Sequence, residues 1–235
     1  MDDALIYLSN AKKSKGYTYT DLARKTGISK NSIVMYFSNQ NSLMNMSYKY
    51  CTTIFNMLDI DIEWFYSNYF CYKYKLNEDI NRWKELNPVD YSFRSQKEKI
   101  KNRIFKLESR KNVNLESLNS IKLMYNAFFR DKKIMDTFKN ENDLMSDEQY
   151  NTYVVPILYN LNRFNKAVPV GCMGIVMNHL YQSEYSLKDL SVLCDISYKP
   201  LLQYSTGKQK FEKMRIQTVL KICYILNIKL TELDD

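Results

Sequence analysis

Two stretches of this chain match without a gap: YTYTDLARKTGISKNSIVMY (residues 17–36) and YSLKDLSVLCDISYKPLLQY (residues 185–204). A shift of 168 positions places all of residues 17–65 on residues 185–233. The matched positions are mostly apolar at helical spacing, or Ser and Asp where a helix would begin. They include Tyr17 with Tyr185, Asp21 with Asp189, Leu22 with Leu190, Ile28 with Ile196, Ser29 with Ser197, Tyr36 with Tyr204 and Ile54 with Ile222. The shared packing pattern predicts that the two ends of the chain fold alike.

The remaining sequence predicts an all-α fold. It has five Gly and four Pro in 235 residues, long segments of 3.6-residue periodicity and almost no strict alternation. We expect three domains: two terminal modules at residues 1–65 and 170–235, and a helical middle domain at residues 66–169.

Two helices of the middle domain can be predicted individually. The first spans residues 91–111, with Phe93, Ile100, Ile104 and Leu107 on one apolar stripe and mostly basic residues off it. We favour a solvated basic face whose apolar stripe pairs with another subunit; the alternative is that the basic face lies on DNA phosphates. The second helix, residues 148–164, should kink at Pro156 unless this proline lies in its first turn.

Composition favours a basic intracellular protein. Lys and Arg number 34 against 26 Asp and Glu, a net charge of +8 that suits a polyanionic partner. The five cysteines lack CxxC spacing and there is a single histidine, His179, so we expect reduced thiols, no metal site and no cofactor. The acidic start and the absence of a long apolar run predict a cytoplasmic protein without a signal peptide or membrane span. The sparse catalytic residue types indicate that it is not an enzyme.

Both matching stretches have the pattern of a helix-turn-helix. Such a unit needs a small residue where its helices touch, a residue tolerant of positive φ at the turn and a branched apolar anchor on the second helix. Ala23, Gly27 and Ile33 occupy these places. Ser29 is expected to cap the second helix, which leaves residues 30–32 in its exposed first turn.

Residues 1–65, with GYTYTDLARKTGISKNSI, resemble the lambda-repressor/Cro (XRE) helix-turn-helix family. The second copy is similar at its far side, where residues 204–208, YSTGK, match the family's Tyr-x-x-Gly-Lys end to the recognition helix. Tyr19 and Leu187 replace the family's common Gln, which removes an expected phosphate contact. Pro200 would be the third residue of a helix capped by Ser197, where no intrahelical N–H is lost. In both copies the connection to the closing helix is about three residues longer than usual for the family, which supports duplication of one atypical ancestor.

The segment GISKNSIVMYFSNQNSLM (residues 27–44) also resembles the end of a TetR-type DNA-binding domain. That family would make residues 45–180 a helical ligand-binding domain. Gly16 lies too close to Leu22 for that family, and the second copy has no place in its architecture. We therefore prefer the XRE resemblance.

The resemblance implies a sequence-specific regulator of transcription, repressor-like and bacterial or phage in type, that binds double-stranded DNA with one or two heads. We expect a homodimer, no membrane partner, and a middle domain that dimerises or senses a small-molecule or protein effector. The alternatives are a TetR-like ligand-responsive repressor and an interaction protein, such as an antirepressor or immunity factor, that keeps the helices without binding DNA. The expected DNA-binding residues are Ser29, Lys30, Asn31, Ser32, Gln40 and Asn41 in the first copy, and Tyr198, Lys199, Gln203, Lys208 and Lys210 in the second.

Overall fold

The computed structural model describes residues 3–88, 90–110, 113–138, 143–164, 166 and 169–233. The predicted all-α class is confirmed: within these ranges the chain is built of helices, and β-type pairing is confined to two isolated bridges, Ser47–Arg215 and Ser92–Leu144. Across the described ranges, no helix combines the length and the apolar character needed to cross a bilayer.

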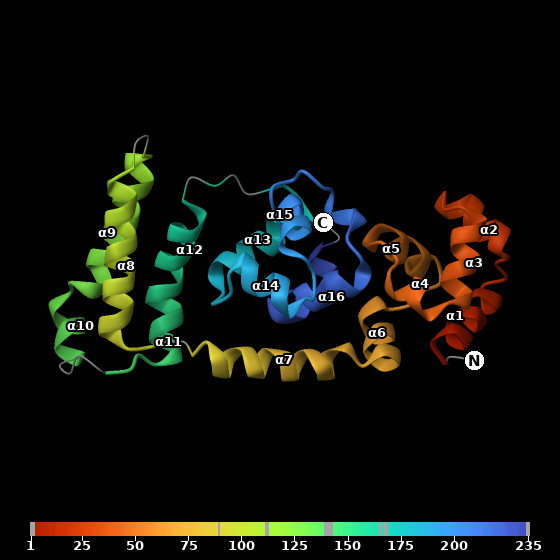
Figure 1. Cartoon of the computed structure of the whole chain (residues 1–235), viewed down its shortest axis with the longest axis horizontal. Helices are drawn as coiled ribbons and strands as arrows, with labels where there is room; N and C mark the ends of the chain where they lie inside the picture. Colours follow the sequence, from red (N-terminus) through yellow and green to blue (C-terminus); the bar gives the residue numbers. More distant parts are fainter. Residues whose placement is uncertain are drawn as a thin grey trace.

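Each end of the chain forms a unit of several short helices (Figure 1). We call residues 3–70 the N-terminal repeat and residues 171–233 the C-terminal repeat. The N-terminal repeat contains α1 (Asp3–Ser14), α2 (Tyr19–Thr26), α3 (Lys30–Ser38), α4 (Gln40–Met44), α5 (Tyr48–Met57) and α6 (Ile62–Phe70). The C-terminal repeat contains α13 (Cys172–Gln182), α14 (Leu187–Leu193), α15 (Tyr198–Ser205), a 3₁₀ turn (Phe211–Lys213), α16 (Ile216–Ile225) and a second 3₁₀ turn (Leu230–Leu233).

The two repeats have equivalent backbones at the offset of 168 residues except just after α3 and α15, where Asn39 (φ −138°) precedes α4 but its equivalent Gly207 (φ 71°) turns the chain before a 3₁₀ segment. Ser29 and Ser197 have the same angles, φ −58° and ψ 140°. The left-handed residues also coincide, because Asp59 and Asn227 have φ 53° and 52°. The equivalence extends beyond the matched sequence, since α1 and α13 occupy corresponding places before the first turn.

Local hydrogen bonds explain why both units begin their second helix at the same place. The Oγ1 of Thr18 accepts from the Asp21 N–H at 3.1 Å, and the Asp21 carboxylate accepts from the Thr18 N–H at 2.9 Å. Ser186 and Asp189 form the same reciprocal pair at 3.2 and 2.8 Å. These are capping boxes, which satisfy N–H groups that the helix itself leaves unpaired.

The two repeats pack against each other through equivalent residues. The Tyr48 N–H donates to the Met214 carbonyl at 2.7 Å, and the Ile216 N–H donates to the Met46 carbonyl at 2.8 Å. Ser47 lies opposite Arg215, its equivalent at the 168-residue offset. An antiparallel pair of equivalent residues has a local two-fold axis at its centre. Because the repeats share their internal backbone, this axis relates them approximately as whole units.

The unusually long connection that the sequence predicts in both copies provides this interface. Residues 46–48 and 214–216 belong to it, and the ring of Phe211 packs edge-on against Tyr48 with centroids 5.6 Å apart. Buried apolar residues of both repeats form one continuous cluster, the first core. The two repeats therefore fold around a common interior.

Helix α7 (Tyr72–Leu86) runs along the C-terminal repeat and leads to the middle of the chain (Figure 1). The Tyr224 hydroxyl donates to the Asn77 side chain at 2.6 Å, and the rings of Trp83 and Tyr185 lie 4.8 Å apart. Residues 66–86 fall in the predicted middle domain, yet Tyr66, Tyr72 and Leu76 belong to the first core.

The middle of the chain has a separate second core. It is formed by α8 (Phe93–Glu108), α9 (Leu115–Phe129), α10 (Lys132–Thr137), a π-helical turn (Tyr150–Val154) and α12 (Val155–Arg163). The short helix α11 (Asp147–Gln149) leads into the π turn and contributes no residue to this core. Pro156 lies in the first turn of α12, directly after the π turn, where it removes no hydrogen bond of that helix.

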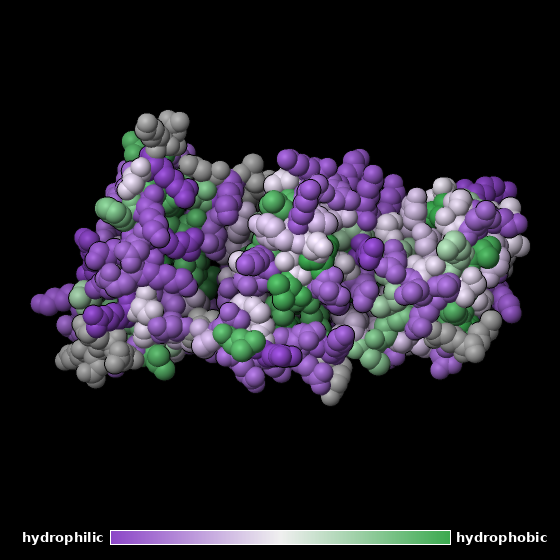
Figure 2. All heavy atoms as spheres, viewed as in Figure 1, coloured by the Kyte–Doolittle hydropathy of each residue, from purple (hydrophilic) through white to green (hydrophobic). Residues whose placement is uncertain are grey.

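The expectation that the apolar stripe of α8 pairs with another subunit is wrong. Phe93, Ile100, Ile104 and Leu107 are all buried inside the second core, against residues of α9 and α12. The side of α8 that carries basic residues remains at the surface. In the space-filling view the visible face over α8 and α9 is mainly hydrophilic (Figure 2).

Candidate nucleic-acid interface

Helix α3 presents an exposed first turn. Ser29 forms the predicted cap: its Oγ accepts from the Ser32 N–H at 3.1 Å, and the two hydroxyls are 2.8 Å apart. Ser32 is half-buried, and its hydroxyl already forms a hydrogen bond with Ser29. Lys30 and Asn31 are exposed. Ile33 is fully buried and anchors the helix. Of the four residues predicted here, Lys30 and Asn31 have the freest side chains.

The exposed face of α3 continues with apolar residues that the sequence analysis missed. Val34 and Met35 are 37% and 55% exposed. They follow Lys30 and Asn31 by four residues, so they lie one turn further along the same face. This i, i+4 spacing in the sequence could have identified them.

The next helix adds polar groups beside α3. Gln40 and Asn41 are exposed in the first turn of α4, and Asn39 caps that helix by accepting from the Ser42 N–H at 2.9 Å. The start of α4 therefore offers amide side chains beside the end of α3, as expected for phosphate contacts.

Helix α15 has the same place in the C-terminal repeat but a different cap. Ser197 holds the expected cap position, with Pro200 as the third residue of the helix, but the Ser197 side chain makes no capping hydrogen bond. The donor in the first repeat is the N–H of Ser32, and the equivalent residue is Pro200, which has none. The helix still begins at Tyr198, since proline is accepted in a first turn.

The predicted residues of α15 differ in exposure. Tyr198 is 46% exposed, Lys199 is exposed and Gln203 is half-buried. Lys208 and Lys210 are exposed in the segment after Gly207, whose φ of 71° turns the chain. The five residues thus lie on one helix and the turn that follows it.

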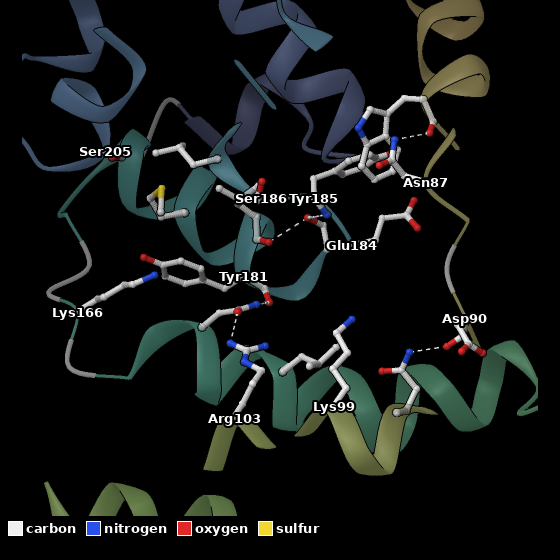
Figure 3. A pocket seen from close by; sticks show the side chains of 18 of the residues that line it. Asn87, Asp90, Lys99, Arg103, Lys166, Tyr181, Glu184, Tyr185, Ser186 and Ser205 are labelled. Atoms are coloured by element: carbon white, nitrogen blue, oxygen red, sulfur yellow. Dashed lines mark hydrogen bonds between the residues drawn. The ribbon is translucent and has the colours of Figure 1, made fainter. Parts of the chain in front are cut away.

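One edge of α15 faces a large cleft. The cleft has a volume of about 1030 Å³ and lies between the C-terminal repeat and the helices α8 and α12. Tyr198 and Leu202 line it, whereas Lys199, Gln203, Lys208 and Lys210 do not. Figure 3 shows this pocket, with Arg103 and Lys99 on one side and Tyr181 and Ser186 on the other. The middle of the chain therefore lies beside α15 of the C-terminal repeat.

Three of the five thiols are buried, whereas Cys71 is exposed and Cys172 is half-buried. Cys51, Cys194 and Cys223 are buried, which raises the pKa of each thiol, that of Cys223 to about 12. Among the side chains that the structure describes, no three His, Cys, Asp or Glu residues come together in a way that could hold a metal ion.

Comparisons of the chain with protein-family models, with curated proteins and with solved structures each return no match.

Proposed function

We propose that this chain is a sequence-specific double-stranded DNA-binding regulator of transcription, repressor-like, with one XRE-like helix-turn-helix head in each repeat. The observation that carries the proposal is the approximate two-fold axis between Ser47 and Arg215. It places α3 and α15 at equivalent positions on opposite sides of the axis. Duplex DNA has local two-fold axes of its own, and repressor dimers match them with two recognition helices.

The exposed groups of the heads suit a major groove. In a helix-turn-helix, residues at the start of the second helix contact base edges, which assigns this role to Lys30 and Asn31 in the first head and to Tyr198, Lys199 and Gln203 in the second. Val34 would meet the methyl group of a thymine. Gln40, Asn41, Lys208 and Lys210 would contact the phosphates, which fix register without carrying sequence information.

Two heads in one chain predict an operator with two half-sites. Their centres would lie about one helical turn, ~34 Å, apart. The half-sites would be only approximately palindromic, because Lys30 and Asn31 correspond to Tyr198 and Lys199. A protein with this sequence asymmetry would bind its operator in a single orientation.

The proposal is tested by selecting duplexes from a random library and measuring binding with charge-reversed variants. We expect Lys30→Glu and Lys199→Glu each to cost roughly 1–3 kcal/mol, about 5- to 150-fold in affinity. The control is Lys132→Glu, which changes an exposed lysine at the start of α10 in the middle of the chain. The affinity should also fall with salt, with a log–log slope of about −0.9 for each phosphate contacted.

Failure to enrich any duplex would refute the proposal, as would equal losses in the three variants. If Lys30→Glu alone weakens binding, the N-terminal repeat is the single working head. That result would contradict binding through two heads and would support binding through the N-terminal repeat alone.

A second candidate is an interaction protein that uses α3 to bind another protein. The exposure of Val34 and Met35 favours it, because apolar side chains with a single neighbouring lysine suit a protein groove. Met35→Lys distinguishes the two functions. The added cation should strengthen DNA binding and weaken insertion into an apolar groove.

No observation favours the TetR-like alternative. It would require residues 45–180 to form one ligand-binding domain. Residues from both ends of that range, such as Met46, Phe55, Met173 and Val176, instead belong to the core that the two repeats share.

A further inference from the structure

The cleft beside α15 has the size and shape of a ligand site. Its volume of about 1030 Å³ is at the upper end of pockets that hold small molecules, ~300–1,000 Å³. Its walls come from three parts of the chain: the end of α7, the α8–α12 face and the C-terminal repeat (Figure 3). Leu158, Leu180 and Leu202 give it an apolar wall.

One end of the cleft holds cations without acidic partners. Arg103 of α8 donates from Nη2 to the Asn162 Oδ1 at 2.8 Å, and the Nζ of Lys166 lies 5.3 Å from the centre of the Tyr181 ring. No carboxylate of the described residues lies within ion-pair distance of either cation. Two like charges therefore lie near each other at this end of the cleft, Arg103 half-buried and Lys166 exposed, and their described partners are neutral.

The surroundings of both cations act against their charged forms. Burial lowers the pKa of Arg103, and burial together with the nearby Arg103 charge lowers the pKa of Lys166. A half-buried cation such as Arg103 is ordinarily balanced by an acidic group or a bound anion. Here the described protein provides amide and aromatic groups instead, so a bound anion would complete the site.

The cationic surface continues along α8. A smaller adjoining cavity of about 280 Å³ shares Arg103 and Lys166 with the cleft and adds Lys106 and Arg110. Lys99 lines the main cleft. The spacing of Lys99, Arg103, Lys106 and Arg110 places all four on one side of the helix. Several cations at one end suit a group with more than one negative charge.

The opposite end of the cleft carries acidic groups. Asp90 and Glu184 both line it, and Glu184 is paired at 3.4 Å with Lys84. Asp90 accepts from the Ser92 N–H through Oδ1 at 2.9 Å. The other carboxylate oxygen of Asp90 and that of Glu184 can accept hydrogen bonds from hydroxyl or amino groups of a ligand. Trp83 and Tyr185 line the same part of the cleft and offer aromatic surface.

We propose that the cleft binds a small organic phosphate of the nucleotide class. Its phosphate contacts Arg103 and Lys166, its body lies along the apolar wall and its N–H or O–H groups face Asp90 and Glu184. A phosphate carries more than one negative charge, which complements the cations at one end of the cleft. A nucleoside provides hydrogen-bond donors for the carboxylates and a flat ring for the aromatic side chains at the opposite end. A concave pocket of this volume encloses such a molecule, whereas duplex DNA is too wide to enter it.

The test is calorimetric titration of the full chain with AMP, GMP, CMP and UMP as probes, and with the matching nucleosides. We expect at least one monophosphate to bind, and its nucleoside to bind at least about tenfold more weakly, because charge-assisted hydrogen bonds to the phosphate are lost. Arg103→Met and Lys166→Met should each weaken the monophosphate by about tenfold or more. Lys132→Met, outside the cleft, is the matched control and should leave the affinity unchanged.

Circular dichroism and thermal unfolding show whether each variant is folded. The two variants lie on different segments, so a folding defect in one leaves the other as the test. The inference is overturned if no monophosphate binds the full chain, if nucleoside and monophosphate bind equally, or if both folded variants keep the original affinity. None of these measurements involves DNA, so the outcome is independent of the proposed regulatory function.

Discussion

The contact between Tyr48 and Phe211 allows a direct measurement of whether the repeats pack as described. The two rings come from different repeats and meet edge-on, with centroids 5.6 Å apart and planes at 74°. Both residues are buried, with 4% and 7% of their surface exposed. An aromatic pair of this geometry contributes roughly 0.5–1.5 kcal/mol beyond the area it buries. Replacing either ring by Leu keeps apolar volume and removes this edge-to-face term.

The measurement is a double-mutant cycle: urea unfolding of the original chain, Tyr48→Leu, Phe211→Leu and the double variant. We expect a coupling free energy of about 0.5–1.5 kcal/mol. Tyr19 and Phe37 form a matched control inside the N-terminal repeat, with centroids 5.5 Å apart and planes at 74°. Phe128 belongs to the second core, so the unfolding free-energy changes of Phe128→Leu and Tyr48→Leu should simply add in the double variant.

Additivity of Tyr48→Leu and Phe211→Leu within about 0.3–0.5 kcal/mol, together with normal coupling in the control pair, would refute the inter-repeat interface. The approximate two-fold axis would then have no packed interface to support it. Without that axis, the proposal that both repeats bind one operator together would also be refuted.

Three further predictions concern local stability and pH. Ser29→Ala should destabilise the chain by about 1 kcal/mol because it removes a cap, whereas Ser197→Ala should cost almost nothing, and urea unfolding compares them. Gly27→Ala should destabilise the chain by roughly 1 kcal/mol, because Gly27 has a φ of 70° that alanine rarely adopts. At the equivalent position Asp195 has a φ of 53°, so Asp195→Gly should stabilise the chain. Equal effects of the two substitutions in thermal unfolding would contradict this reasoning. The pKa of Cys223 is raised from 9.0 to about 12, so its contribution to stability is present below pH 9 and is lost as the pH rises towards 12. The free energy of unfolding should therefore fall less steeply between pH 9 and 12 in Cys223→Ala than in the original chain, by up to about 1.4 kcal/mol per pH unit. An unchanged slope would show that the thiol has the same pKa in the folded and the unfolded chain.

The sequence predicted the elements whose causes are local. The starts of α2 and α14 follow from Ser, Thr and Asp three residues apart, and the turn at Gly27 follows from its tolerance of positive φ. The helices that begin at residues 19, 30 and 48 recur at residues 187, 198 and 216 without a shift, whereas α4 corresponds to a turn and a 3₁₀ segment. The missing side-chain hydrogen bond at Ser197 also has a local cause, because the equivalent of the Ser32 donor is Pro200, which has no N–H.

The remaining features depend on contacts between distant segments. Nothing in residues 46–48 indicates that they pair with residues 214–216, because the pairing arises only when two folded units meet. The same holds for the cleft, where Arg103 and Lys166 approach each other from separate elements. The side of α8 that lines the cleft could have been noticed, since Lys99, Arg103, Lys106 and Arg110 recur at helical spacing.

Covalent linkage of the two paired repeats removes a constraint that ordinary homodimers face. When two separate subunits associate, the paired fraction falls on dilution and follows the amount of protein in the cell. Here the partner of each repeat is carried on the same chain, so its local concentration is set by the linking segments. Pairing of the repeats should therefore persist at a few copies per cell, and changes in expression level should alter only the number of paired units.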